Sequence, residues 1–147
     1  MTTIAFKDGV MAGDGLITQH DRVLATGFKK VIMESNIMLG LVGNPDLIIK
    51  LKQVLKKGDG KAYNKTLDHI SEILDDRSEV LVYNTKTKLL TSHTKTGYMI
   101  VEDKVYAIGS GACYAMPCLV TDNTAAEAVL MASNFDIRTN SNITEVK

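Results

Sequence analysis

Two short apolar runs at the start of the chain form its first clear pattern. They cover residues 2–6 and 10–12, and Asp8-Gly9 separates them. An Asp-Gly pair between strand-forming runs is the strongest short-range signal for a tight β-hairpin. The chain is therefore expected to enter its fold as a strand, with no leader before it.

Residues 22–74 show strand-like patterns followed by helical periodicity. The predicted strands are residues 22–26, 30–33 and 37–42. The last of these runs is continuously apolar, which is typical of a strand covered on both faces. Apolar positions then recur every three or four residues, with lysines on the other side. The predicted helices are residues 46–57 and 65–74, and Gly58-Asp59-Gly60 is expected to end the first of them.

Residues 79–139 show the same order of strands and then helices. The predicted strands are residues 79–84, 89–92, 98–102, 104–108 and 136–139. Asp103 is expected in a tight turn, and Pro117 is expected to disturb a short helix over residues 114–120. Thr124-Ala-Ala-Glu127 has the form of a capping box and predicts another helix. The chain thus shows strands followed by a helix pair, and then the same order again. This order predicts an α+β fold, a four-layer αββα sandwich with two antiparallel sheets between helix layers.

Length and charge narrow the range of functions. The 147 residues are expected to form a single domain, residues 1–147, that can bury a sizeable core. Lysine plus arginine and aspartate plus glutamate both number 17, so no basic surplus favours nucleic acid. No apolar run approaches the roughly 20 residues of a membrane span, and no secretory signal is seen. The sequence predicts a soluble cytoplasmic protein without nucleic-acid or membrane partners.

The cysteines and histidines do not form a metal motif. Cys113 and Cys118 lie in a small-residue apolar segment without histidines at metal spacing, and buried free thiols are expected. His20, His69 and His93 form no motif with one another. Each histidine is expected to be a surface or packing residue.

Thr2 is the first candidate for chemistry. A small residue after Met1 permits removal of the initiator methionine, which would leave a threonine with a free α-amine. Such a residue carries a nucleophile, Oγ1, and a base, its amine, within one residue. The amine has an ordinary pKa of about 7.7 to 8.0, and a nearby cation would push it toward the neutral form. A lysine close to Thr2 is therefore expected. The alternative is that Thr2-Thr3 merely begins a β-branched strand.

Several short blocks together resemble one family. In order, they are Thr-Thr-Ile at 2–4, Asp-Gly-Val at 8–10, Ala-Gly-Asp-Gly at 12–15 and Phe-Lys-Lys-Val at 28–31. They resemble the start of the bacterial HslV peptidase and, more distantly, of the proteasome β subunit. Residues 106–115 and 136–144 are similar to later HslV segments, whereas residues 46–94 are the least similar and shorter. The resemblance implies the N-terminal nucleophile hydrolase sandwich and peptide-bond hydrolysis inside a ring-shaped chamber.

The resemblance also implies roles for five residues. Thr2 would attack the scissile carbonyl through Oγ1, with its own amine accepting the proton. Lys30 matches the family lysine that lowers the pKa of groups in the site. Asp14 would pair with Lys30. The N–H of Gly43 would lie in the oxyanion hole. Ser110 would support the Thr2 amine.

A substrate pocket and an ion site are implied by the same resemblance. The pocket would be lined by Ile17, Phe28 and Ile32 and would favour apolar side chains. The backbone carbonyls near Ser133, Asp136 and Thr139 match a place where the family can bind a monovalent cation such as Na⁺. No cofactor is expected to be required.

The sequence departs from the family at residues 43–46. Gly-Asn-Pro-Asp stands there in place of a loop that is one residue longer in HslV, which alters the oxyanion loop and the pocket wall.

Three hypotheses about function follow. The first is a threonine-type endopeptidase that acts on polypeptides within a homo-oligomeric ring and works with an HslU-like ATPase unfoldase. The second is a catalytically inactive ring or interaction subunit with the same fold. The third is a different amidase, because a fold does not define its substrate. The presence of Thr2, Asp14 and Lys30 together favours the first.

Overall fold

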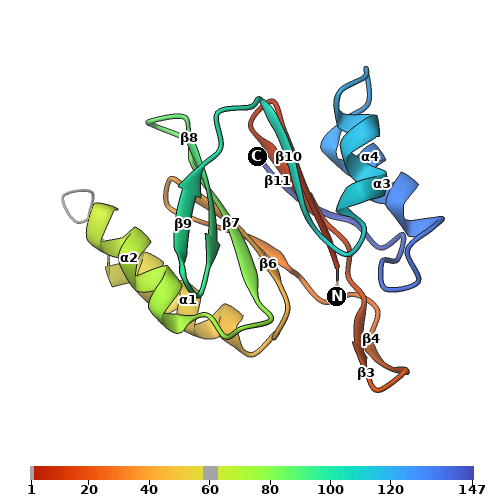
Figure 1. The fold of residues 1–147 in the computed structure, drawn as a ribbon, viewed down its shortest axis with the longest axis horizontal. Coiled ribbons are helices and arrows are strands. Elements are labelled where there is room, and N and C mark those ends of the chain that lie inside the picture. Colours follow the sequence, from red (N-terminus) through yellow and green to blue (C-terminus); the bar gives the residue numbers. More distant parts are fainter. Residues whose placement is uncertain (1, 58–62) are drawn as a thin grey trace.

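Two antiparallel sheets form the centre of the molecule, whose computed structural model describes residues 2–57 and 63–147 (Figure 1). In order across the sheet, the first contains β10 (Val105–Gly109), β1 (Thr3–Lys7), β2 (Val10–Gly13) and β11 (Thr144–Val146). The second contains β5 (Val31–Glu34), β6 (Ile37–Val42), β7 (Glu79–Asn84), β8 (Leu89–Thr94) and β9 (Gly97–Ile100). A separate ribbon is formed by β3 (Ile17–Gln19) and β4 (Arg22–Ala25), which extends away from both sheets.

Helix pairs cover the outer faces of both sheets. The first pair is α1 (Leu47–Lys57) and α2 (Tyr63–Ile73), which lies on the five-stranded sheet. The second pair is α3 (Ala112–Leu119) and α4 (Ala125–Ser133), which lies on the four-stranded sheet. The predicted four-layer sandwich is thus confirmed. None of the helices in the described part of the chain is both long and apolar enough to cross a membrane.

Local signals placed several of these elements correctly. Asp8 and Gly9 have φ values of +52° and +77°, as the predicted hairpin turn requires. Strand β1 then pairs with β2 with Lys7 opposite Val10. The capping box forms at α4, where Thr124 Oγ1 accepts a hydrogen bond from the Glu127 N–H at 3.2 Å. The predicted Gly58-Asp59-Gly60 helix stop lies outside the described residues.

The prediction of a closing strand at residues 136–139 is wrong. The Asp136 carboxylate accepts hydrogen bonds from the Arg138 N–H at 3.1 Å and from the Thr139 hydroxyl at 2.6 Å, which bends the chain into a turn. The strand that closes the sheet comes later, at β11, and pairs with β2. These hydrogen bonds of the Asp136 carboxylate take the place of pairing with a neighbouring strand, so the segment forms a turn.

Three smaller expectations also need correction. Asp103 does not lie in a hairpin turn, because β9 and β10 belong to different sheets and the chain crosses between them there (Figure 1). Pro117 lies inside α3, which continues through it. Cys113 is exposed, because α3 buries Ala115 and Leu119 instead, whereas Cys118 is partly buried and packs against the same core cluster as those two residues.

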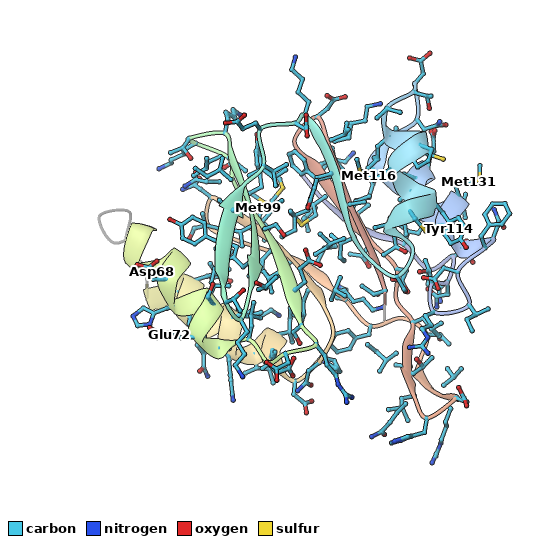
Figure 2. The ribbon with its side chains drawn as sticks, viewed as in Figure 1. Asp68, Glu72, Met99, Tyr114, Met116 and Met131 are labelled. Atoms are coloured by element: carbon cyan, nitrogen blue, oxygen red, sulfur yellow. The ribbon has the colours of Figure 1, made fainter. Side chains whose placement is uncertain are left out.

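The outer surfaces of the helix layers differ in character (Figure 2). Asp68 and Glu72 lie at the surface on α2. Tyr114 and Met131, on α3 and α4, are exposed apolar side chains. Met99, on the edge strand β9, is also exposed.

Candidate active site

Thr2 directly precedes β1, which lies between β10 and β2. Its neighbour Thr3 pairs with Gly109 of β10, and Ile4 pairs with Gly13 of β2. Gly109 has φ +98°, and a Cβ there would lie 1.9 Å from the Thr2 carbonyl oxygen. Only glycine permits this approach. The strand therefore presents Thr2 in a defined position.

Asp14 and Lys30 converge on the Thr2 side chain. Asp14 directly follows β2, and Lys30 directly precedes β5. Lys30 Nζ lies 3.1 Å from each carboxylate oxygen of Asp14. Lys30 also donates to Thr2 Oγ1, and Thr2 Oγ1 in turn donates to Asp14 Oδ1. All three residues are at least 97% buried, with exposures of 2%, 1% and 3% for Thr2, Asp14 and Lys30.

Backbone N–H groups complete the surroundings of the Asp14 carboxylate. Its Oδ1 accepts from Thr3 N at 3.0 Å, and its Oδ2 accepts from Leu16 N at 3.0 Å and Asn140 N at 3.3 Å. Buried charges are tolerated when they are paired and hydrogen-bonded. The carboxylate is thus held in one orientation, directed at Lys30.

Burial shapes the electrostatics of Lys30. Removal from water lowers the pKa of the Lys30 ammonium below its ordinary value, and the charge and hydrogen bond of Asp14 oppose that shift only in part. An ammonium whose pKa is lowered in this way exchanges its proton more easily than a surface lysine does. Lys30 is therefore a desolvated amino group in direct contact with Thr2 Oγ1.

Gly43 lies beside Thr2 at the end of β6, where the chain turns with φ +109°. A Cβ at this position would lie 2.5 Å from Ser78 Oγ and 2.7 Å from the Arg77 carbonyl oxygen. Ser78 Oγ also accepts a hydrogen bond from Asn44 N at 3.1 Å. The segment before β7 thus anchors the glycine loop, and only glycine fits at position 43.

A second hydrogen-bonded chain lies next to this centre. Ser110 Oγ and Thr139 Oγ1 each donate to Asp136 Oδ2 at 2.6 Å, and Thr139 Oγ1 lies 2.7 Å from Thr3 Oγ1. Burial works against ionisation of Asp136, but the hydrogen bonds from Ser110 and Thr139 outweigh it and hold the pKa of Asp136 below its ordinary value. The predicted Ser110 is thereby linked to the residue that follows Thr2 in the chain.

The residues predicted to hold Na⁺ lie at and after the end of α4. The Asp136 carbonyl oxygen accepts from Thr139 N at 3.1 Å, and the side chains of both residues are engaged as described above. Across the described ranges, no group of three or more histidine, cysteine, aspartate or glutamate residues is placed to bind a metal. A carbonyl site for a monovalent cation stays a prediction.

A small pocket with both polar and apolar walls opens beside Thr2, Lys30 and Gly43. Its other walls are Leu16, Ile17, Thr18, Phe28, Leu41 and Pro45. Two of the three predicted pocket residues, Ile17 and Phe28, therefore line the same pocket as Thr2. Ile32 is instead buried in the core between the five-stranded sheet and the α1–α2 layer.

Sequence reasoning missed the contributions of Asn140, Ser78 and the Asp136 carboxylate. Asn140 lies 126 positions after Asp14 in the chain, and Ser78 lies 34 after Asn44. No local pattern marks such contacts, because they exist only after the sheets have formed. The Asp-x-x-Thr spacing at residues 136–139 was the one available signal, since it is typical of an aspartate turn.

Comparisons with known proteins agree with this architecture. No protein-family profile matches the chain, and no curated protein matches it by sequence. Among solved structures, HslV from Trypanosoma brucei is similar with TM-score 0.78 and 19% identity, covering 99% of this chain and 98% of that one. BPH from Thiobacillus denitrificans in complex with epoxomicin is similar with TM-score 0.72 and 18% identity, covering 99% and 96%. BPH alone is similar with TM-score 0.72 and 18% identity, covering 99% and 95%.

These likenesses establish the fold. The chain has the four-layer architecture of HslV and BPH along nearly its whole length, which confirms at the level of fold the resemblance inferred from its short sequence blocks. At sequence identities of 18–19% the likeness shows a shared fold and does not show a shared activity.

Proposed function

We propose that this chain is a threonine-type endopeptidase with Thr2 as its nucleophile once Met1 has been removed. The observation that supports the proposal is the contact of Thr2 Oγ1 with both members of the buried Lys30–Asp14 pair. Replacing a buried ion pair by apolar residues is often neutral or stabilising, so stability alone gives little reason to keep one beside the end of a strand. Activation of a hydroxyl gives such a reason.

The reaction begins with attack of Thr2 Oγ1 on the peptide carbonyl carbon. The Oγ1 proton passes to the Thr2 amine, whose pKa the Lys30 cation holds down, so that the amine is neutral at the start. The N–H of Gly43 stabilises the oxyanion. The C–N bond then breaks, the leaving amine takes the proton, and an ester remains on Oγ1. Water, deprotonated by the same Thr2 amine, hydrolyses the ester and restores Oγ1–H.

The pocket beside the nucleophile indicates the substrate class. Its walls include the apolar side chains of Leu16, Ile17, Phe28 and Leu41. A pocket of this chemistry binds an apolar side chain next to the scissile bond. We infer polypeptide substrates cut beside apolar residues. Assembly into a homo-oligomeric ring, with an HslU-like ATPase as partner, rests on the likeness in fold to HslV.

The test is intact mass combined with labelling by a peptide epoxyketone. Its two electrophilic carbons can react with the hydroxyl and the amine of one N-terminal threonine. We expect the native protein to lack Met1 and to form one covalent adduct. Thr2→Ser should still form the adduct, and Thr2→Ala should not, because only the first keeps a hydroxyl. Light scattering on the same samples should show a closed multimer.

A contrary result has a definite meaning. Retention of Met1 without an adduct would overturn the peptidase proposal and would favour an inactive ring subunit. An adduct on a protein that scatters as a monomer would instead favour an amidase with an open cleft.

A further inference from the structure

Asn140 joins the two loops that carry the charged residues of the site. One loop follows β2 and contains Asp14 and Gly15, and the other follows β4 and leads through Thr26 to Lys30. The Asn140 side chain accepts a hydrogen bond from Gly15 N at 3.0 Å and donates one from Nδ2 to the Thr26 carbonyl at 2.8 Å. One amide thus bonds both loops at once.

The backbone of the same residue contacts the carboxylate. Asn140 N donates to Asp14 Oδ2 at 3.3 Å, so the asparagine bonds Asp14 directly as well as its neighbour Gly15. The loops are also packed closely, because a Cβ on Gly15 would lie 2.5 Å from the Thr26 carbonyl oxygen. Phe28 N adds a direct bond to the Gly15 carbonyl at 3.0 Å.

We propose that Asn140 is a positioning residue that sets the spacing of Lys30 and Asp14 beneath Thr2, a role that rests on the proposed peptidase function. The geometry requires an acceptor toward Gly15 N and a donor toward the Thr26 carbonyl. A primary amide supplies both within one planar group. Asn140 is not among the residues that line the pocket, so it acts through the lysine and the carboxylate and not through substrate.

The variants Asn140→Asp and Asn140→Ala disturb this link in different ways. Asn140→Asp keeps the size and the acceptor but directs a carboxylate oxygen at the Thr26 carbonyl and adds a negative charge near Asp14. That charge favours the protonated form of Lys30 and of the amine beside it. Because the added charge acts in this way whatever the role of Asn140, the neutral variant Asn140→Ala is the one that separates positioning from simple support of the fold.

The experiment measures the rate of epoxyketone labelling against pH for the native protein, Asn140→Ala and Asn140→Asp. Asn140→Ala should lower the maximal rate by about 10- to 100-fold, since a displacement on the order of 1 Å in such a site costs that much. Its half-saturating inhibitor concentration should stay unchanged. Asn140→Asp should shift the midpoint of the rate profile to higher pH.

Asn142→Ala is the matched control. Asn142 Nδ2 donates to the same Thr26 carbonyl at 2.9 Å, but its side chain makes no bond to the Asp14 loop. This variant should label within about twofold of the native rate, because the link to Gly15 and Asp14 stays intact. Equal losses in Asn142→Ala and Asn140→Ala would overturn the positioning role.

A second measurement does not depend on activity. NMR titration of the Lys30 side chain should give a lower midpoint in the neutral variant Asn140→Ala than in the native protein, because a displaced Asp14 opposes the effect of burial less. Thermal unfolding confirms that both proteins are folded. An unchanged Lys30 midpoint would overturn the proposal even if labelling occurs. Absence of labelling in the native protein, with the Lys30 midpoint still shifted, would overturn the peptidase function alone.

Discussion

The two helix layers pack on their sheets with side chains of different size. Under α3 and α4 the contact consists largely of alanines, namely Ala5, Ala12, Ala107, Ala115, Ala125, Ala128 and Ala132, all buried. Under α1 and α2 it consists of large aliphatic residues, among them Leu47, Leu51, Leu55, Ile70 and Leu74. Alanine contacts bring backbones close and leave little room for adjustment. The sheet that carries Thr2 is therefore the more tightly constrained of the two.

The hydrogen bonding of buried polar atoms also differs between the half of the molecule covered by α1 and α2 and the half covered by α3 and α4. In the described part of the chain, two buried side-chain atoms lack a hydrogen-bond partner, Ser71 Oγ and His93 Nδ1. Ser71 lies on α2, and His93 lies opposite Val80, a residue of the core beneath α1 and α2. The charged pair at the site, by contrast, is bonded on every side. The comparison indicates that the half covered by α3 and α4 is specified by close fit and the half covered by α1 and α2 by apolar volume.

Truncation in the aliphatic half should give the largest loss of stability. Leu51 is fully buried in α1, and Leu51→Ala should lower the free energy of unfolding by about 2–5 kcal/mol through lost burial and a cavity. Ile49 on the same helix is 63% exposed, so Ile49→Ala should change stability far less. Urea unfolding of both variants measures this difference in stability. Equal losses would contradict the importance of the buried position of Leu51.

Low pH should lower the stability of the protein through His93, which lies on β8 of the five-stranded sheet. Burial lowers the pKa of His93 from 6.5 to about 4, so the folded protein keeps the ring neutral while the unfolded chain protonates it. Stability should then fall as pH falls from 6.5 toward 4, by on the order of 3 kcal/mol in total. Unfolding measured across this range checks the slope, which His93→Gln should flatten. A native slope that the variant retains would assign the effect to other groups.

Enlarging a residue in the alanine-rich half should cost less stability and more activity. Ala128 is fully buried between α4 and the sheet, and Ala128→Leu should lower the free energy of unfolding by about 1–3 kcal/mol through overpacking. Because that sheet carries Thr2, the labelling rate of the folded protein should fall as well, whereas Leu51→Ala should leave it near the native rate. Ala126, which is only partly buried against the same cluster, provides the control as Ala126→Leu. Normal labelling of Ala128→Leu would show that the close fit is not needed for function.

Elements with strong local chemistry were predictable from sequence. The Asp8-Gly9 turn and the Thr124 capping box depend on residues within three positions of each other, so the sequence alone reveals them. The turn at Asp136 was missed because the residues have a strand-like pattern, whereas the Asp136 carboxylate accepts hydrogen bonds from the Arg138 N–H and the Thr139 hydroxyl. Asp103 was misplaced because sequence order does not reveal which sheet a strand joins.

The candidate site divides in the same way. Thr2, Asp14, Lys30 and Gly43 could be named from short blocks at matching spacing, since the order of these blocks along the chain carries the family resemblance. By itself the sequence thus determined the layer order and the candidate nucleophile with its charged pair. Only the tertiary structure decided which residues surround that pair. Asn140 and Asp14 meet across 126 positions because β11 pairs with β2, and contacts of that kind arise only when sheet pairing brings distant segments together.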